Sequence, residues 1–325
     1  RLRKAPLLYG LDTGDVLADP ALDARRQLWV TSAARILATH GMIRFDEVAG
    51  TLHPTSVGRI ASRYYLGHET IAIFATRLRN GIREADALDC MSRATDFAQI
   101  PLRDSEEDEL TGLQERVPCQ VPGGTATAPG KVNILLQAHI SHLFIEDFAL
   151  VSDARYVAQN AGRVLQALFE LSLDRGFATA ASAFLNLAKS VDKCVWPFEH
   201  PLRQYPTLNA DVIHRITMYA DDLEVSQVRA LPRAALASLL RVNERVAGIV
   251  QDAAERFPAI DMTVRARPLP GDVCRLDIAL RRAFTWDERL HCATLPIVVW
   301  VENAAHHVVY SDRVALRPTP QPTGA

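Results

Sequence analysis

The sequence predicts a mainly α-helical protein that ends in a small β-structure. Apolar residues recur at helical spacing through most of residues 1–256. Alternation at period two, which is typical of strands, becomes frequent only after Phe257 and Pro258. The 325 residues, of which 48% are hydrophobic, are enough for two or more domains with buried cores.

Residues 1–65 are predicted to form a helix, a hairpin and a second helix. Asp19-Pro20 opens the first helix and Gly41 ends it. Short strands are expected at 42–45 and 51–53, and Pro54-Thr55 opens the next helix. This order outlines the C-terminal part of a winged helix whose own first helix is missing or cut short. The apolar face of the first predicted helix consists of Leu22, Leu28, Trp29, Ala33, Ile36 and Leu37.

The rest of the chain divides into four predicted segments. Residues 66–205 form a helical bundle, and residues 206–256 form shorter helices that suit a helix-hairpin-helix unit. Residues 257–316 form an immunoglobulin-like or fibronectin-III-like β-sandwich, and residues 317–325 are disordered by composition. The sandwich is expected to be incomplete, because it offers about four strands where about seven are usual. An exposed sheet edge, which favours aggregation, should result.

Composition excludes several classes of protein. The formal net charge of −2 means that any nucleic acid must be held by a local groove. The five cysteines lack a CxxC pair, so neither a zinc site nor a disulfide framework is expected. The apolar run 132–140 is too short to span a bilayer and no signal peptide is visible, which predicts a cytoplasmic or nuclear protein without membrane contact.

No catalytic, metal or cofactor site is predicted in this chain. Gly124 to Val132 imitates a phosphate-binding loop, but it has one residue too many between its glycines and ends in valine where a hydroxyl must hold magnesium. His139 and His142 share a helix face without a third metal ligand nearby. The acidic run Glu106 to Glu109 is interpreted as the solvated start of a helix.

One long helix, predicted from Asp153 to Gly176, is the strongest candidate for a binding surface. At about 100° per residue, its polar side chains fall in one stripe: Arg155, Gln159, Arg163, Gln166 and Glu170. Arginine and glutamine can bind phosphates and unstacked bases, whereas a solubilising face would often use lysine. A merely solvated face is the alternative. Gly162 lies in the middle of the predicted helix, where glycine is unfavourable. The close approach of a ligand or another backbone, or tight helix packing, would explain a glycine at this position.

Several motifs resemble, in the same order, the Sec63 homology region of Ski-two-like RNA helicases. Gly58-Arg-Ile-Ala-Ser-Arg-Tyr-Tyr65 resembles the end of their winged helix, and Gly130 to Ser141 resembles a helix of the region. Asp153 to Leu173 is similar to its ratchet helix. Leu185 to Lys189, Pro201 to Tyr205 and Phe284 to Glu288 also match. Two short segments, Met42 to Phe45 and Tyr156 to Asn160, resemble the first cassette of the activating-signal-cointegrator type more than the spliceosomal type.

The resemblance implies a mechanism and partners. The bundle closes over two motor domains, and the ratchet helix touches single-stranded RNA or DNA as ATP hydrolysis moves the strand 3′ to 5′. Gln159, Arg163 and Gln166 are the contacts that the resemblance implies, and Arg155 is added as an expected contact from the polar stripe. Because the motor is absent from this sequence, ATP and Mg²⁺ are expected only in the motor domains. The chain is then a fragment, a truncated gene model or a stand-alone protein, and the sequence leaves these alternatives open. Other partners would be subunits of a ribonucleoprotein or ribosome-associated complex. The alternative is a protein-interaction scaffold that binds no strand.

Overall fold

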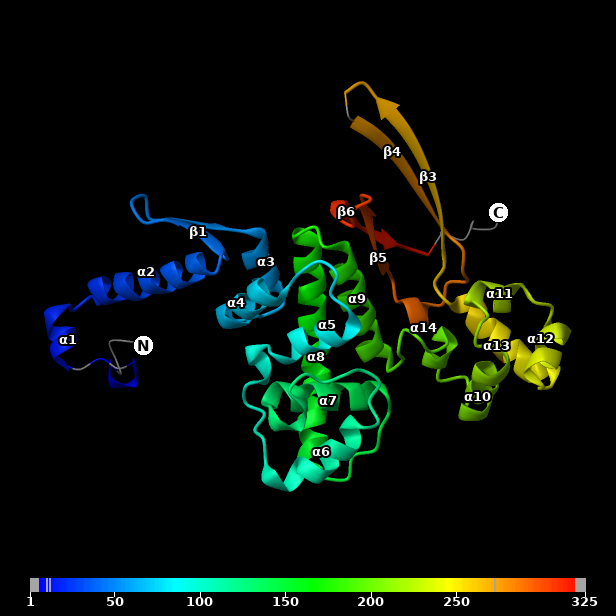
Figure 1. Ribbon diagram of the computed structural model, residues 1–325. Helices are drawn as coiled ribbons and strands as arrows, with labels where there is room; N and C mark the ends of the chain where they lie inside the picture. The colour runs from blue at the N-terminus through cyan, green and yellow to red at the C-terminus, as the bar shows by residue number, and fades with distance from the viewer. Residues whose placement is uncertain (1–5, 10, 12, 272, 319–325) are drawn as a thin grey trace. The chain divides into compact units, whose positions relative to one another are not determined.

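The computed structural model describes residues 6–9, 11, 13–271 and 273–318, so residues 319–325 of the predicted disordered tail lie outside the described residues. The chain divides into two compact units. The first contains residues 1–139 and 143–188, and the second contains residues 140–142 and 189–325. Helices dominate both the first unit and the start of the second, and strand pairs follow at the C-terminal end (Figure 1). The mainly α-helical class is confirmed.

The N-terminal segment has the predicted order of helix, hairpin and helix. The helix α2 is followed by the antiparallel strands β1 and β2 and then by α3. The predicted helix start at Asp19-Pro20 was wrong, because α2 begins at Asp23. Asp19 lies before the helix, and its carboxylate accepts a hydrogen bond from the Ala24 N–H at 2.9 Å. The six-residue α1 precedes α2, in keeping with a shortened first helix. The bounds are η1 Pro6–Tyr9, α1 Thr13–Ala18, α2 Asp23–Thr39, β1 Ile43–Asp46, β2 Thr51–Pro54 and α3 Ser56–Arg63.

The apolar face predicted for α2 is largely uncovered. Leu28, Trp29 and Ile36 are 56%, 39% and 43% exposed, whereas Leu22 is buried. Helical spacing groups these side chains on one face, but spacing alone does not reveal whether another element packs there. Within the described residues α2 makes its main contacts with β1. The apolar spacing of this face is therefore not matched by a packed core.

The body of the first unit is helical, and α7 lies at its centre. Residues 130–138 of α7 are all buried, although they include Lys131, Asn133 and Gln137. The long helix α8 runs beside it, and Figure 1 shows α8 with α5, α6 and α7 around it. The bounds are α4 His68–Arg77, α5 Glu84–Ser92, η2 Thr95–Phe97, η3 Asp104–Glu106, α6 Glu107–Gln114, η4 Gly124–Ala126, α7 Ala128–Ile140, α8 Phe148–Asp174 and α9 Ala178–Lys193.

A buried charge network joins these helices. It consists of Arg103, Glu106, Lys131 and Asp153. The Lys131 side chain is fully buried, and its Nζ lies 2.5 Å from Glu106 Oε2 and 2.8 Å from Asp153 Oδ2. Arg103 pairs with the same two carboxylates, at 2.9 Å from Asp153. Two cations and two anions balance one another, which a buried charge requires. The network ties α7 and the segment before α6 to α8.

The second unit combines short helices with two β-hairpins. The helices share one core that includes Val212, Leu236 and Val250. The strands form two separate two-stranded antiparallel sheets, β3 with β4 and β5 with β6. The four strands that the sequence predicts for residues 257–316 are present, but the described residues form hairpins with free edges rather than one larger sheet. The bounds are η5 Pro201–Gln204, α10 Ala210–Tyr219, α11 Val225–Ala230, α12 Arg233–Leu240, α13 Glu244–Arg256, β3 Ile260–Leu269, β4 Val273–Arg282, α14 Glu288–His291, β5 Leu295–Glu302 and β6 Val308–Leu316.

No helix among the described residues is both long enough and apolar enough to cross a membrane. The division into four predicted domains is finer than the two compact units, and it stays a prediction.

The buried charge network predicts how the first unit responds to the loss of Lys131. Lys131→Met leaves two carboxylates facing Arg103 alone, so the free energy of unfolding should fall by roughly 3–5 kcal/mol. Adding Glu106→Gln restores the balance of charge and should recover most of that loss. Urea unfolding followed by circular dichroism measures both variants. A loss below about 1 kcal/mol for Lys131→Met would show that the network contributes little.

Candidate nucleic-acid interface

The helix α8 begins earlier than the sequence predicts. It runs from Phe148 to Asp174, and Asp147 caps it by accepting a hydrogen bond from the Leu150 N–H at 2.8 Å. Asp153, which was predicted as the start, lies in the second turn and belongs to the buried charge network. The prediction took Asp153 as the cap, but the buried apolar face continues one turn earlier, through Leu150. At 1.5 Å per residue, α8 is about 40 Å long.

The two faces of α8 divide as the sequence predicts. The predicted apolar face is buried, and it consists of Val157, Ala161, Val164, Leu165, Leu168 and Leu171. On the opposite side Arg155, Gln159 and Gln166 are all exposed. These three side chains form what we call the polar edge, and they lie within about 40° of one another on a helical projection.

Arg163 lies at the border of the polar edge and is engaged by the protein itself. Its guanidinium donates to the carbonyl oxygens of Tyr64 and Tyr65. It also binds Asp96 Oδ1 at 2.6 Å and Asn160 Oδ1 at 3.1 Å. The side chain is only 27% exposed. The sequence could not show this, because the acceptors are up to 99 residues away along the chain.

Glu170, the last member of the predicted stripe, is buried against α3. Its carboxylate pairs with Arg63 at 2.7 Å and accepts a hydrogen bond from the Tyr64 hydroxyl. Nearby, the Ser56 hydroxyl donates to Asp174 at 2.9 Å. The C-terminal half of α8 is therefore fixed to both ends of α3, and the Glu170 carboxylate is not exposed beside the polar edge.

Tyr65 is an exposed aromatic side chain that no pattern in the sequence predicts as part of the site. Its side chain is 85% exposed, and its backbone adopts a positive φ of 54°, which is uncommon for a residue other than glycine. The Arg163 guanidinium binds its carbonyl oxygen from α8. The one sequence feature that could have indicated Tyr65 is the Tyr64-Tyr65 pair at the end of a predicted helix. That position alone does not show that the Tyr65 ring is exposed.

The part of α8 that bears the polar edge contains a single acidic residue. Between Phe148 and Gln166 the only acidic residue is Asp153, which is 15% exposed and paired with two cations. Arg155 therefore has no acidic neighbour on its own helix face. A Cβ added at Gly162 would meet no atom within 4 Å, so tight packing does not explain this glycine.

The other sequence motifs form no site. Lys131, which imitates the lysine of a phosphate-binding loop, is fully buried between carboxylates and is turned away from solvent. The interpretation of Glu106 as solvated was wrong, because it is 1% exposed and pairs with Lys131, whereas Glu107 and Asp108 are exposed. His142 binds the Cys194 carbonyl oxygen at 3.1 Å. The described ranges contain no group of three or more histidine, cysteine or acidic side chains placed to hold a metal ion.

Comparison with known protein families assigns the chain to one of them. Residues 54–322, which are most of the sequence, match the Sec63 Brl domain. The chain belongs to this family, in the form that occurs in Ski-two-like RNA helicases.

Curated relatives match over nearly the whole chain. The RQC trigger complex helicase SLH1 of Saccharomyces cerevisiae is 36% identical over 94% of this chain. The activating signal cointegrator 1 complex subunit 3 of Dictyostelium discoideum is 33% identical over 96%, and the human U5 small nuclear ribonucleoprotein 200 kDa helicase is 32% identical over 95%. The chain spans only 14% to 15% of the length of these relatives. These identities do not separate the activating-signal-cointegrator type from the spliceosomal type. The assignment to the cointegrator type therefore stays a prediction.

The contacts of Glu170 predict the stability of the α3–α8 connection. Glu170→Ala removes a buried acceptor shared by Arg63 and Tyr64, so the free energy of unfolding should fall by roughly 1–3 kcal/mol. Amide hydrogen exchange in residues 56–66 should become faster. Asp174→Ala, which removes only an exposed contact with Ser56, is the matched control and should change stability by less than about 1 kcal/mol. Equal effects of the two changes would contradict the assigned importance of Glu170.

Proposed function

We propose that this chain is an accessory region of an ATP-dependent 3′–5′ RNA helicase, and that it guides single-stranded nucleic acid past the motor. The observation that carries the proposal is the polar edge of α8. It is exposed, the stretch of α8 from Phe148 to Gln166 has no unpaired carboxylate, and the helix is fixed at both ends. ATP and Mg²⁺ would be bound by the motor domains. This chain would contribute strand contacts and no hydrolysis.

The chemistry of the polar edge suits a strand of any sequence. Arg155 can pair with a phosphate, and the amides of Gln159 and Gln166 can both donate to and accept from base edges. Phe148, the first residue of α8, lies on the same helix face as Arg155, and its exposed ring offers a stacking surface. The open space at Gly162 lets a strand approach the helix backbone. A single cation gives weak electrostatic attraction, which suits a strand that must keep moving.

We assign Arg163 a positioning role in addition to the strand contact that the sequence predicts. The sequence predicts that it contacts the strand directly, and that contact stays a prediction. Its bonds to the carbonyl oxygens of Tyr64 and Tyr65 support a positioning role, in which it holds Tyr65 with its ring exposed. An aromatic ring held this way can stack on a base. The strand would then lie between the polar edge and Tyr65.

Docking of protein partners is the second candidate function. The exposed apolar face of α2 and the free edges of the hairpins favour it, since such surfaces usually mark interaction sites. The names of the relatives place them in a ribonucleoprotein, a signal cointegrator complex and a quality-control trigger complex. By analogy, this chain would serve in the nucleus or the cytoplasm, next to its motor domains and within a complex of the spliceosomal, cointegrator or ribosome quality-control type.

Charge reversal on the polar edge tests strand binding. Gln159→Glu and Gln166→Glu are nearly isosteric, and with Arg155→Glu they place three carboxylates where a strand would lie. The affinity for fluorescein-labelled oligouridine at low salt should fall by at least about tenfold, and Arg155→Glu alone should lower the salt slope by roughly one. Fluorescence anisotropy at several salt concentrations measures both effects.

The control is Arg116→Glu, which reverses an exposed charge elsewhere in the first unit and should leave binding nearly unchanged. Arg163 is left intact, because its reversal would break contacts within the fold. If the triple variant binds oligouridine as the unmodified chain does, or if neither binds, the strand-guiding proposal fails and the docking function remains.

A further inference from the structure

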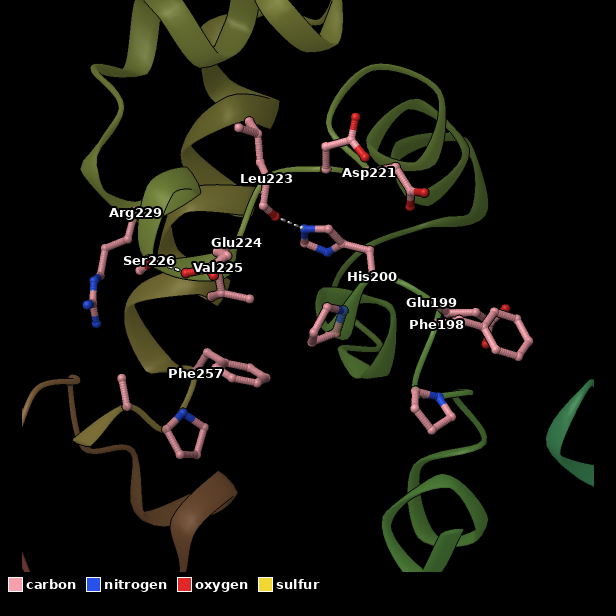
Figure 2. Close-up of a pocket in the computed structure, with 15 residues that line it drawn as sticks. Phe198, Glu199, His200, Asp221, Leu223, Glu224, Val225, Ser226, Arg229 and Phe257 are labelled. Atoms are coloured by element: carbon pink, nitrogen blue, oxygen red, sulfur yellow. Dashed lines mark hydrogen bonds between the residues drawn. The ribbon is translucent and has the colours of Figure 1, made fainter. Parts of the chain in front are cut away.

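The second unit contains a hollow of about 460 Å³ that strand guiding does not use. Figure 2 shows it between one side that bears Val225 and Phe257 and another that bears His200, Glu199 and Phe198. Its walls come from the segment before η5, the turn between α10 and α11, and the residues that follow α13. We call it the acidic pocket. Segments far apart in sequence meet there, so the hollow is a product of the tertiary fold.

The apolar part of the acidic pocket includes an aromatic ring that is exposed and yet held in place. The Phe198 ring stacks on Trp196, with centroids 5.8 Å apart and planes 8° from parallel. Phe198 is 67% exposed, whereas Trp196 is 3% exposed and donates its indole N–H to the Ser141 hydroxyl at 2.8 Å. A ring fixed in this way loses little conformational entropy when a partner covers its free face.

The rim of the acidic pocket carries four carboxylates. Glu199 pairs with Arg203, and Glu224 accepts a hydrogen bond from Ser226 at the start of α11. Asp221 and Asp222 are exposed, and they enter none of the ion pairs found between the described residues. The one cationic side chain of the lining, Arg229, donates to the Ala283 carbonyl oxygen. The pocket is therefore left with a negative charge.

His200 does not offset this charge at neutral pH. It is 6% exposed, and burial lowers its pKa below the ordinary value of 6.5, against a smaller opposing effect of the Leu223 carbonyl and of Asp221. Its Nε2 lies 3.1 Å from the Leu223 oxygen, and its Nδ1 accepts from the Leu202 N–H. The ring is thus a neutral part of the wall.

The acidic pocket continues into a second hollow of about 240 Å³. The two hollows share Phe198, Glu199, His200 and Asp221. The second adds Arg203, which pairs with Glu199, and Ile213, Ile216 and Thr217 from α10. Together they make a groove that an extended segment can follow across Phe198, with carboxylates near its path.

We propose that this groove binds a basic segment of a partner protein, in which an arginine or lysine is flanked by apolar residues or proline. The cation would lie against the free face of Phe198 and beside Asp221 and Asp222, where a cation–π contact and ion pairing add to one another. The flanking apolar residues would cover Phe257, Val225 and the prolines of the wall. Phosphate backbones are repelled by the same carboxylates, so the groove selects protein over nucleic acid.

A peptide array tests the proposal on the full chain. The peptides carry arginine, lysine, glutamine or glutamate at the centre, and proline, leucine, valine or phenylalanine at the flanking positions. The fluorescently labelled chain should be retained by the arginine and lysine series and not by the other two. Asp221→Asn with Asp222→Asn should weaken binding of the best arginine peptide by roughly five- to tenfold, and Phe198→Ala by at least about threefold.

Asp252→Asn is the matched control, because it removes an exposed carboxylate of the same unit outside the groove. It should leave peptide affinity unchanged. Circular dichroism melting checks that each variant is folded, and no loss is expected for the aspartate changes since both side chains are exposed. The proposal is overturned if the array shows no preference for a central cation. It is also overturned if the double variant and Asp252→Asn behave alike.

Discussion

The buried pairing of charges along α8 is the constraint on which the rest of the first unit depends. At one end the fully buried Lys131 side chain holds Asp153 and Glu106, of which Glu106 is buried as well. At the other end Glu170 and Arg163 bind the segment that ends α3. Such pairs contribute little net stability relative to apolar packing, but breaking one is costly. They therefore select one position of α8 relative to α3 and α7.

This constraint explains how one helix carries two kinds of polar residue. Arg163 and Glu170 lie in the same predicted stripe as Arg155, Gln159 and Gln166, but they are engaged by the protein, and only the other three are exposed. A polar edge on a fixed helix can present its donors to a strand without first being ordered, and preorganised contacts cost less entropy. The acidic pocket of the second unit has the opposite charge and is suited to a different partner.

The sequence predicted what depends on local pattern. The helices, the hairpin before α3, the strands of the second unit and the polar face of α8 all follow from spacing and from end signals of a few residues. It could not predict the partners of Arg163, which lie 67 and 99 residues away, or the burial of Glu106 by Lys131. It also could not show that the apolar face of α2 is largely uncovered, because periodicity does not reveal what covers a face. Tyr65 was missed because its exposure follows from contacts with α8.

Photo-crosslinking tests the central claim most directly, since it reports position rather than affinity. Oligonucleotides that contain 4-thiouridine are bound to the unmodified chain, irradiated and digested, and the crosslinked peptides are identified by mass spectrometry. The account predicts crosslinks within residues 148–166 and at Tyr65, and none in the acidic pocket. Crosslinks confined to the second unit, or to the faces of the first unit away from α8, would contradict it.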